Sequence, residues 1–227
     1  MRPDYLALFA KCFGLVLLIV FMLSVPQSSN AHRMGKEASV IEGERFAVTN
    51  IMAFPKWGGV VHRAWARRPE AEGVCARRMG RECQLLEWQA FLAGLQDTQA
   101  AQRLEQVNRY INRTRYRSDE RNWGQIDYWA APGEFFARGG DCEDYAIAKY
   151  FSLQALGFSG DAMRIVILKD TRRRETHAVL EVTLGQEKVL LDNLNDRLVS
   201  WDEVGHYAPF YSVNELSYWL HSAKGDI

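Results

Sequence analysis

Cys142 is the side chain of this sequence best suited to nucleophilic chemistry, and it lies within the run GGDCEDYAIAKYF at residues 139–151. A cysteine attacks as its thiolate, and nearby negative charge disfavours that form. Three carboxylic acids surround it in the sequence, namely Asp141, Glu143 and Asp144. Some other feature must therefore favour the thiolate if Cys142 is to react.

The predicted position of Cys142 in a helix supplies such a feature. Asp141 suits the N-cap, the residues from Cys142 to Leu156 suit the body of the helix, and Gly157 suits the C′ position just beyond it. Cys142 then lies in the first turn, where the helix dipole and unpaired N–H groups stabilise a thiolate.

A reactive cysteine also needs a base, and the sequence offers a histidine and an aspartate downstream of the helix. Strand-like patterns at residues 162–169, 176–183 and 187–193 predict an antiparallel meander. His177 lies in the second segment and Asp192 in the third. An imidazole can pair with a thiolate and later protonate the leaving amine, while an aspartate orients the imidazole.

The turn between the last two strands predicts how His177 and Asp192 lie. If Leu184–Gly185 is a two-residue turn, Thr183 faces Gln186. Counting outward from that pair, His177 faces Asp192 on the same side of the sheet, near enough for a carboxylate to hold an imidazole. A one-residue change in the loop would place the two side chains on opposite faces.

Each of these residues also has an ordinary structural interpretation, because cysteine is often buried and because histidine and aspartate are common in sheets and turns. Their combination at a helix start and across one hairpin favours catalysis. We therefore predict Cys142 as the nucleophile, His177 as the general base and acid, and Asp192 as the orienting residue.

The N-terminus has the layout of an export signal. Arg2 and Lys11 precede the apolar run CFGLVLLIVFMLSV, and Ser29 and Ala31 suit the positions before a cleavage site. The run is shorter than the roughly 20 residues of a spanning helix, although an uncleaved anchor is the alternative. We expect residues 1–31 to be removed on export to the periplasm, residues 32–44 to be flexible, and residues 45–227 to form one domain.

Charge and cysteine content set further limits. The chain has 28 basic and 28 acidic residues, which gives no argument for nucleic acid as a partner. Beyond residue 31 the cysteines are Cys75, Cys83 and Cys142. Cys75 and Cys83 are a local pair that could form a disulfide in an oxidising compartment, which leaves Cys142 as the odd thiol, either buried, intermolecular or reactive.

Two amphipathic helices are predicted upstream of the cysteine. The first runs from Cys83 to about Gly94, and the second from Thr98 to Tyr116 with Leu104, Val107 and Ile111 on one stripe. Residues 117–140 show turn formers and aromatics without a sustained period, and we expect an ordered connection that delivers Cys142 to its helix.

Longer stretches around these residues resemble the bacterial transglutaminase-like cysteine proteinases, and in particular their periplasmic LapG type. The stretches are WGQIDYWAAPGEFFARGGDCEDYAIAKYFSLQALGF, THAVLEV, LLDNL and YSVNELSYW, and the resemblance spans about residues 45–227. It implies an α+β papain-like or transglutaminase-like fold, with N-terminal helices, an antiparallel sheet and the nucleophile at a helix N-terminus. It also implies a Cys142, His177 and Asp192 triad.

The resemblance further implies a biological role. Members of this type are calcium-dependent periplasmic endoproteases that clip the N-terminal region of a large surface adhesin near paired alanines, which releases cells from a biofilm. The periplasmic part of an inner-membrane receptor for cyclic-di-GMP restrains them. We therefore expect an adhesin substrate and such a receptor as partners.

Calcium is expected from the residues as well as from the resemblance. Asp141, Glu143 and Asp144 offer hard oxygen ligands, and a bound cation would offset the charge that disfavours the thiolate. The pattern is not an EF-hand loop, so other groups must complete any site. The alternative is that Asp141 caps the helix while Glu143 and Asp144 complement its dipole.

Stabilisation of an acyl intermediate requires oxyanion donors. The Cys142 N–H suits the first donor, and Trp123, Gln125 and Trp129 are candidates for the second. Two rival functions stay open at this point. An acyl transferase would use the same triad and an amine acceptor, and a non-catalytic periplasmic binding module would keep the fold alone.

Overall fold

The computed structural model describes residues 44–48, 54–66 and 81–221, all within one unit, Ala38–Ile227. The predicted signal peptide (1–31) and nearly all of the predicted flexible segment (32–44) lie outside the described residues. Cys75 does too, so the predicted pairing of Cys75 with Cys83 stays a prediction. Among the described helices, none has both the length and the apolar character needed to cross a bilayer.

Six α-helices and seven strands make up the described fold. The helices are α1 (Pro55–Ala66), α2 (Arg81–Ala93), α3 (Ala100–Asn112), α4 (Asp119–Trp123), α5 (Pro132–Arg138) and α6 (Cys142–Ala155). The strands are β1 (Glu44–Val48), β2 (Met163–Asp170), β3 (Glu175–Leu184), β4 (Glu187–Asp192), β5 (Asn195–Val199), β6 (Tyr207–Val213) and β7 (Tyr218–His221). A short 3₁₀ turn, Gly160–Ala162, joins α6 to β2.

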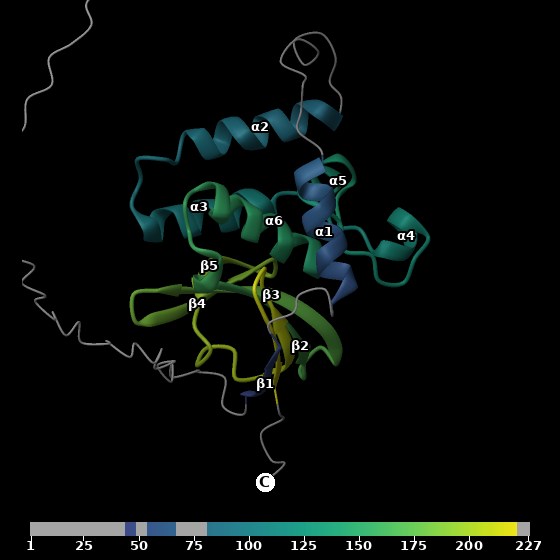
Figure 1. The fold of residues 1–227 in the computed structure, drawn as a ribbon, viewed down its shortest axis with the longest axis vertical. Coiled ribbons are helices and arrows are strands. Elements are labelled where there is room, and N and C mark those ends of the chain that lie inside the picture. The colour runs from purple at the N-terminus through teal and green to yellow at the C-terminus, as the bar shows by residue number, and fades with distance from the viewer. Residues whose placement is uncertain (1–43, 49–53, 67–80, 222–227) are drawn as a thin grey trace, which may run out of the picture. The chain divides into compact units, whose positions relative to one another are not determined.

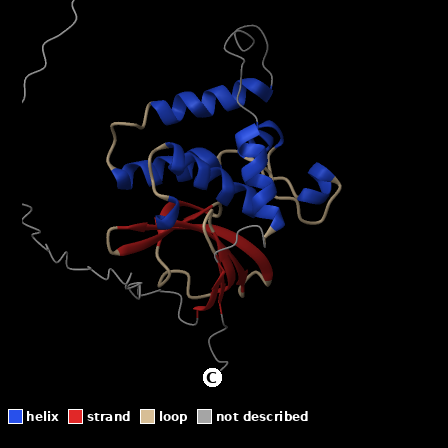
Figure 2. Cartoon of the chain, viewed as in Figure 1, coloured by secondary structure: helices blue, strands red, loops and turns tan. Residues whose placement is uncertain are grey.

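The strands form one antiparallel sheet in the order β1-β7-β6-β2-β3-β4-β5. The helices gather over one face of this sheet (Figure 1), and colouring by secondary structure separates a helical layer from a strand layer (Figure 2). Helices α3 and α6 contact the sheet, whereas α2 packs on α5 farther from it. The predicted α+β class and the predicted meander of β2, β3 and β4 are confirmed.

The alternation of side chains along the strands divides the interior into two cores. On β3, Ala178 and Leu180 face the helices and belong to the larger core. Val179 belongs to a smaller core on the opposite face, together with Val166 and Leu190. This smaller core is closed by the β5–β6 connection instead of by a helix. Because successive side chains of a strand point to opposite faces, β3 has apolar residues on both faces of the sheet.

Helix α6 begins where the sequence predicted. Asp141 is the N-cap, and its N–H donates to Asp144 Oδ2 at 3.2 Å, the N3 half of a capping box. The other oxygen of Asp144 accepts the N–H of Ala130 at 2.6 Å. Asp144 is fully buried, and it therefore ties the preceding connection to the first turn of α6.

The C-terminal end of α6 also follows the prediction. Gly157 adopts a left-handed φ of 87°, and its N–H donates to Gln154 O at 3.0 Å. The N–H of Phe158 donates to Leu153 O at 3.0 Å. These two bonds form a Schellman motif, in which glycine at C′ carries no steric penalty.

Two short helices, α4 and α5, lie within residues 117–140, where an irregular connection was predicted. Their five and seven residues are too few for an apolar period to appear in the sequence. Local signals were nevertheless present at α5, because Pro132 occupies its first turn and Glu134 accepts the N–H of Ala131 at 3.0 Å.

Gly140 is expected to be irreplaceable even by alanine. A Cβ atom at this position would clash with Asp144 Oδ2, which accepts the N–H of Asp141, while Oδ1 of the same carboxylate accepts the N–H of Ala130. Because the buried carboxylate cannot move without losing these bonds, Gly140→Ala should destabilise the protein by about 3 kcal/mol. Urea unfolding measures this loss. Gly58→Ala in α1 is the control, since a Cβ there meets nothing within 4 Å and stability should stay equal or rise; equal stability of both variants would contradict the prediction.

Candidate active site

Cys142 is the first residue of α6, and its half-buried side chain lines a cavity of about 530 Å³. His177, from β3, lines the same cavity, although 35 residues separate the two in the sequence. The remaining lining residues are Asn112, Thr114, Tyr116, Tyr145, Arg173, Glu175, Thr176, Asn193 and Leu194. The fold thus brings the predicted nucleophile and the predicted base to one cavity.

His177 is held by Asp192. The Nε2 atom of the buried imidazole lies 2.9 Å from Asp192 Oδ1. Because this bond uses Nε2, Nδ1 is the ring nitrogen left for the thiol. The structure therefore gives His177 and Asp192 the contact that the sequence predicted.

The route to this contact differs from the prediction. Leu184 pairs with Glu187, so Gly185–Gln186 is the turn and the predicted Leu184–Gly185 turn is wrong. Gly185 supplies the positive φ, 64°, one place earlier in the turn than expected. Each residue of β3 is therefore paired with a β4 residue two positions farther along than predicted. Because side chains alternate between faces, a shift of two leaves His177 and Asp192 on the same face. They become diagonal neighbours, which are still within reach of each other.

Asp192 has two further hydrogen-bond donors that fix its carboxylate. The N–H of Leu194 donates to Oδ1 at 2.9 Å, and the hydroxyl of Tyr207 donates to Oδ2 at 2.7 Å. Burial opposes ionisation of Asp192, but the bond and charge of His177, with these two donors, hold its pKa below the usual value. Tyr207 comes from β6, and no local pattern in the sequence connects it with Asp192.

The environment of the Cys142 thiol combines a backbone N–H of β3 with acidic side chains. The N–H of Ala178 acts to lower the pKa of the thiol. The thiol itself donates to Glu143 Oε2 at 3.2 Å. Burial, followed by the charge of Glu143, raises the pKa of Cys142 well above its usual value. As the sequence suggested, the acidic neighbours suppress the thiolate.

Three carboxylates lie together beside Cys142, and one of them was not predicted. Oxygen atoms of Asp119, Asp141 and Glu143 all lie within 4.8 Å of one another. Asp144 is not in this group, because both of its oxygens accept backbone N–H groups at the start of α6. Asp119 instead reaches the group from α4, with its N–H donating to Asp141 Oδ2 at 3.1 Å.

The chemistry of this cluster fits a hard cation. Asp119 Oδ1 and Asp141 Oδ1 are buried and have no hydrogen-bond donor among the described residues. Burial raises the pKa of Asp119 to about 6, and burial with the charge of Asp141 raises the pKa of Glu143 to about 8. Carboxylates that lack donors and repel one another are stabilised by a bound cation, and Ca²⁺ prefers such oxygen ligands.

None of the three predicted candidates for the second oxyanion donor lines the Cys142 cavity. The ring of Trp123 packs at a tilt against that of Tyr128 with centroids 4.5 Å apart, Trp129 is buried in the larger core, and Gln125 is exposed. Tyr116 does line the cavity and is 58% exposed. Burial, followed by the charge of Cys142, raises the pKa of Tyr116 to about 12, so its hydroxyl stays protonated and can donate.

The sequence model of the bacterial transglutaminase-like cysteine proteinases matches residues 66–225. The chain belongs to this family. The predicted transglutaminase-like fold is therefore confirmed, and the protein is a transglutaminase-like cysteine proteinase. A search of curated protein sequences found no match.

Solved structures of Legionella pneumophila LapG resemble this cysteine proteinase. One shares 28% sequence identity and a TM-score of 0.57, covering 74% of this chain and 88% of the other. An EGTA-treated form shares 27% identity with a TM-score of 0.58, covering 74% and 87%. A calcium-bound form shares 26% identity with a TM-score of 0.56, covering 75% and 92%.

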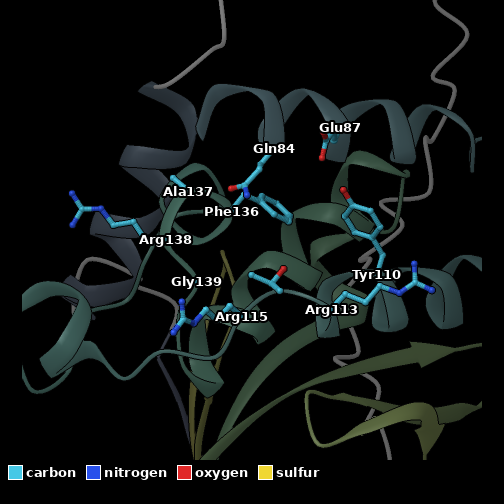
Figure 3. Close-up of a pocket in the computed structure, with 10 residues that line it drawn as sticks. Gln84, Glu87, Tyr110, Arg113, Arg115, Phe136, Ala137, Arg138 and Gly139 are labelled. Carbon is cyan, nitrogen blue, oxygen red and sulfur yellow. The ribbon is translucent and has the colours of Figure 1, made fainter. Parts of the chain in front are cut away.

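A second cavity of this cysteine proteinase, of about 410 Å³, lies between α2, α3 and α5 (Figure 3). Its lining contains no cysteine and no histidine. The guanidinium groups of Arg113, Arg115 and Arg138 point away from the space that Phe136 and Tyr110 border (Figure 3). Of these two cavities, the one that Cys142 lines is therefore the one with both a cysteine and a histidine.

Proposed function

We propose that the protein is a calcium-dependent periplasmic cysteine endopeptidase whose triad is Cys142, His177 and Asp192. The single observation that carries the triad is the His177 imidazole, fixed through Nε2 by Asp192 at 2.9 Å in the cavity that Cys142 lines. Family membership supports peptide hydrolysis as the reaction.

The geometry supports a thioester mechanism. His177 takes the proton of Cys142, and the sulfur attacks the carbonyl carbon of the scissile peptide bond. His177 then returns the proton to the departing amine, which leaves an acyl group on Cys142 as a thioester. Water attacks the thioester with His177 as the base, and the acid product and the free thiol result. Asp192 stabilises the imidazolium in both halves of the cycle.

We propose that Asp119, Asp141 and Glu143 hold the calcium ion. The donor-free buried oxygens of Asp119 and Asp141 support this set, as does the similarity to a LapG structure solved in a calcium-bound form. Bound calcium would offset the negative charge that raises the pKa of Cys142.

The proposed substrate is the N-terminal region of a large surface adhesin, cut near paired alanines, and the proposed regulator is an inner-membrane receptor for cyclic-di-GMP. The resemblance to the LapG type supports both, and the export signal predicted at residues 1–31 supports the periplasm. Cleavage would then release the adhesin and promote dispersal of a biofilm.

Product mass tests the proposed reaction. The calcium-loaded protein is incubated with the N-terminal fragment of an adhesin from the same organism, in the presence of a primary amine. Hydrolysis should give two fragments whose summed mass exceeds that of the substrate by one water. An amine-adducted or crosslinked product would instead establish an acyl transferase, and absence of any reaction together with absence of thiol labelling would indicate a binding module.

Tyr116→Phe tests the oxyanion donor that the structure suggests. Loss of the hydroxyl should lower kcat by about 100-fold with little change in KM, because the bond forms only as the oxyanion develops. Steady-state kinetics on a peptide substrate measures this. Tyr211→Phe is the control, since Tyr211 is half-buried but does not line the cavity. Equal kcat in Tyr116→Phe and the wild type would show that Tyr116 donates no such bond.

A further inference from the structure

The second cavity shares a wall with the cavity that Cys142 lines. The wall is the chain segment 112–116, at and just after the end of α3. Its side chains are divided between the two spaces, with Asn112 and Tyr116 lining the Cys142 cavity, Arg113 and Arg115 lining the second cavity, and Thr114 lining both. An extended polypeptide advances by about 3.3 Å per residue, so one bound chain can pass through two spaces that meet at a single residue. A substrate bound across Cys142 can therefore continue into the second cavity.

Hydrogen bonds hold this wall in place on both sides. The hydroxyl of Tyr145, on α6, donates to Thr114 O. The N–H of Thr114 donates to Ile111 O at 3.0 Å, and the N–H of Arg117 donates to Gly140 O at 2.8 Å. Because the wall is fixed to α3 and to the start of α6, the second cavity lies at a set distance from the nucleophile. A substrate residue in that cavity would be selected at a set distance from the scissile bond.

The second cavity has an aromatic floor and positively charged walls. Phe136 and Tyr110 border the space, and the guanidinium groups of Arg113 and Arg115 extend away from it (Figure 3). Both arginines are exposed, and neither has an ion-pair partner among the residues that the structure describes. The one carboxylate of the lining is Glu87. The cavity therefore suits a ligand with an apolar body and carboxylates at its edge.

The third arginine of the lining, Arg138, is already engaged. Its guanidinium lies over the ring of Trp123, 4.5 Å from the centroid, and donates to Asn122 O at 3.4 Å. Arg113 and Arg115 are thus the lining cations best placed to meet a ligand. A guanidinium presents donors in a planar fork that matches the two oxygens of a carboxylate.

We propose that the second cavity is a substrate subsite, in which Arg113 and Arg115 bind acidic side chains of the polypeptide a few residues from the scissile bond. The proposal rests on the proposed function, because it gives a place to the substrate of that reaction. Aspartate or glutamate side chains would pair with the guanidinium groups, and apolar neighbours in the substrate would pack on Phe136 and Tyr110. No bond is made or broken at this subsite.

Matched peptides test the proposal on the calcium-loaded enzyme. Each pair of peptides spans the cleaved bond and differs by glutamate against glutamine at one position, and the position is varied along both sides of the bond. At positions that reach the second cavity, glutamate should raise kcat/KM by about tenfold, mostly through KM, because the contact is the same in the ground state and the transition state. Equal kcat/KM for both peptides at every position would overturn the proposal.

Charge reversal provides the second arm of the test. Arg113→Glu and Arg115→Glu, singly and together, should abolish the preference for glutamate and favour a lysine peptide instead. A merely structural role would lower activity on all peptides without this reversal. Arg109→Glu is the matched control, since Arg109 is an exposed arginine of the same helix that lines neither cavity. It should keep the wild-type preference, and the same preference in the Arg113 and Arg115 variants would overturn the proposal.

Binding to Cys142→Ala measures the preference without cleavage. The glutamate peptide should bind this variant about tenfold more tightly than the glutamine peptide at low salt, and the difference should shrink as salt is added. Equal Kd values would overturn the proposal even where cleavage by the wild type is established. Failure of the proposed function is recognised separately, since cleavage would then survive in Cys142→Ala or be absent from the wild type, whereas the difference in Kd would persist.

Discussion

Cleavage is expected to disappear in Cys142→Ala, with kcat falling by about a millionfold, which is below detection in most assays. Without the sulfur there is no acceptor for the acyl group, and His177 and Asp192 alone cannot form the thioester. The amount of intact adhesin fragment, followed by gel and by mass, measures the effect.

The same variant should keep its fold. Cys142 is only half-buried, and its thiol is bonded to Glu143 instead of to a core group. We therefore expect the free energy of unfolding to change by less than about 1 kcal/mol. Cys83→Ala, on α2 and outside the cavity, is the control and should retain full activity. Cleavage at the wild-type rate by Cys142→Ala would remove Cys142 from the role of nucleophile.

Removal of calcium is the second change with a large expected effect. Excess chelator should abolish activity, because the carboxylates then act on the thiol without a counter-charge, and the pKa of Cys142 rises. Calcium at about 1,000 times its Kd should stabilise the protein by about 4 kcal/mol. Thermal melts and activity, measured across a calcium titration, report both effects. Full activity in excess chelator would contradict the metal assignment.

Asp119→Asn tests which carboxylates bind the calcium ion. The cluster in the structure contains Asp119, whereas the set predicted from the sequence contains Asp144 in its place. Because Asp119 belongs to the cluster, its replacement should raise the calcium concentration needed for half-activity by about tenfold or more. Glu120→Gln is the matched control, since Glu120 is the next residue of α4, is exposed and does not belong to the cluster. An unchanged calcium requirement in Asp119→Asn would exclude Asp119 from the site.

The carboxylate cluster also predicts how the calcium-free protein responds to pH. Burial and Asp141 raise the pKa of Glu143 from 4.5 to about 8, so the folded state keeps a proton that the unfolded chain has lost. Stability should therefore be full below pH about 4.5 and decrease as pH rises towards about 8. Calcium should remove this decrease. Urea midpoints across this range, with and without calcium, provide the measurement.

Local elements were predictable because their signals are local. The start of α6, its glycine at C′ and the apolar stripe of α3 depend on residues within one or two turns, and all three appear as predicted. The predicted turn between β3 and β4 was wrong by one residue. His177 and Asp192 still lie on the same face of the sheet, because the pairing shifted by two residues and the period of a strand is 2.

Neighbouring residues in the sequence were enough to predict that Cys142 lies at a helix start, that strands carry His177 and Asp192, and that acidic side chains surround Cys142. The place of Asp119 beside Asp141 and Glu143 depends instead on tertiary packing, since a helix 22 residues earlier must fold back to meet them. The hydrogen bond from Tyr207 to Asp192 is likewise a contact between strands far apart in the sequence. Such contacts depend on how helices and strands pack across the sheet, and side-chain spacing along one element carries no information about them.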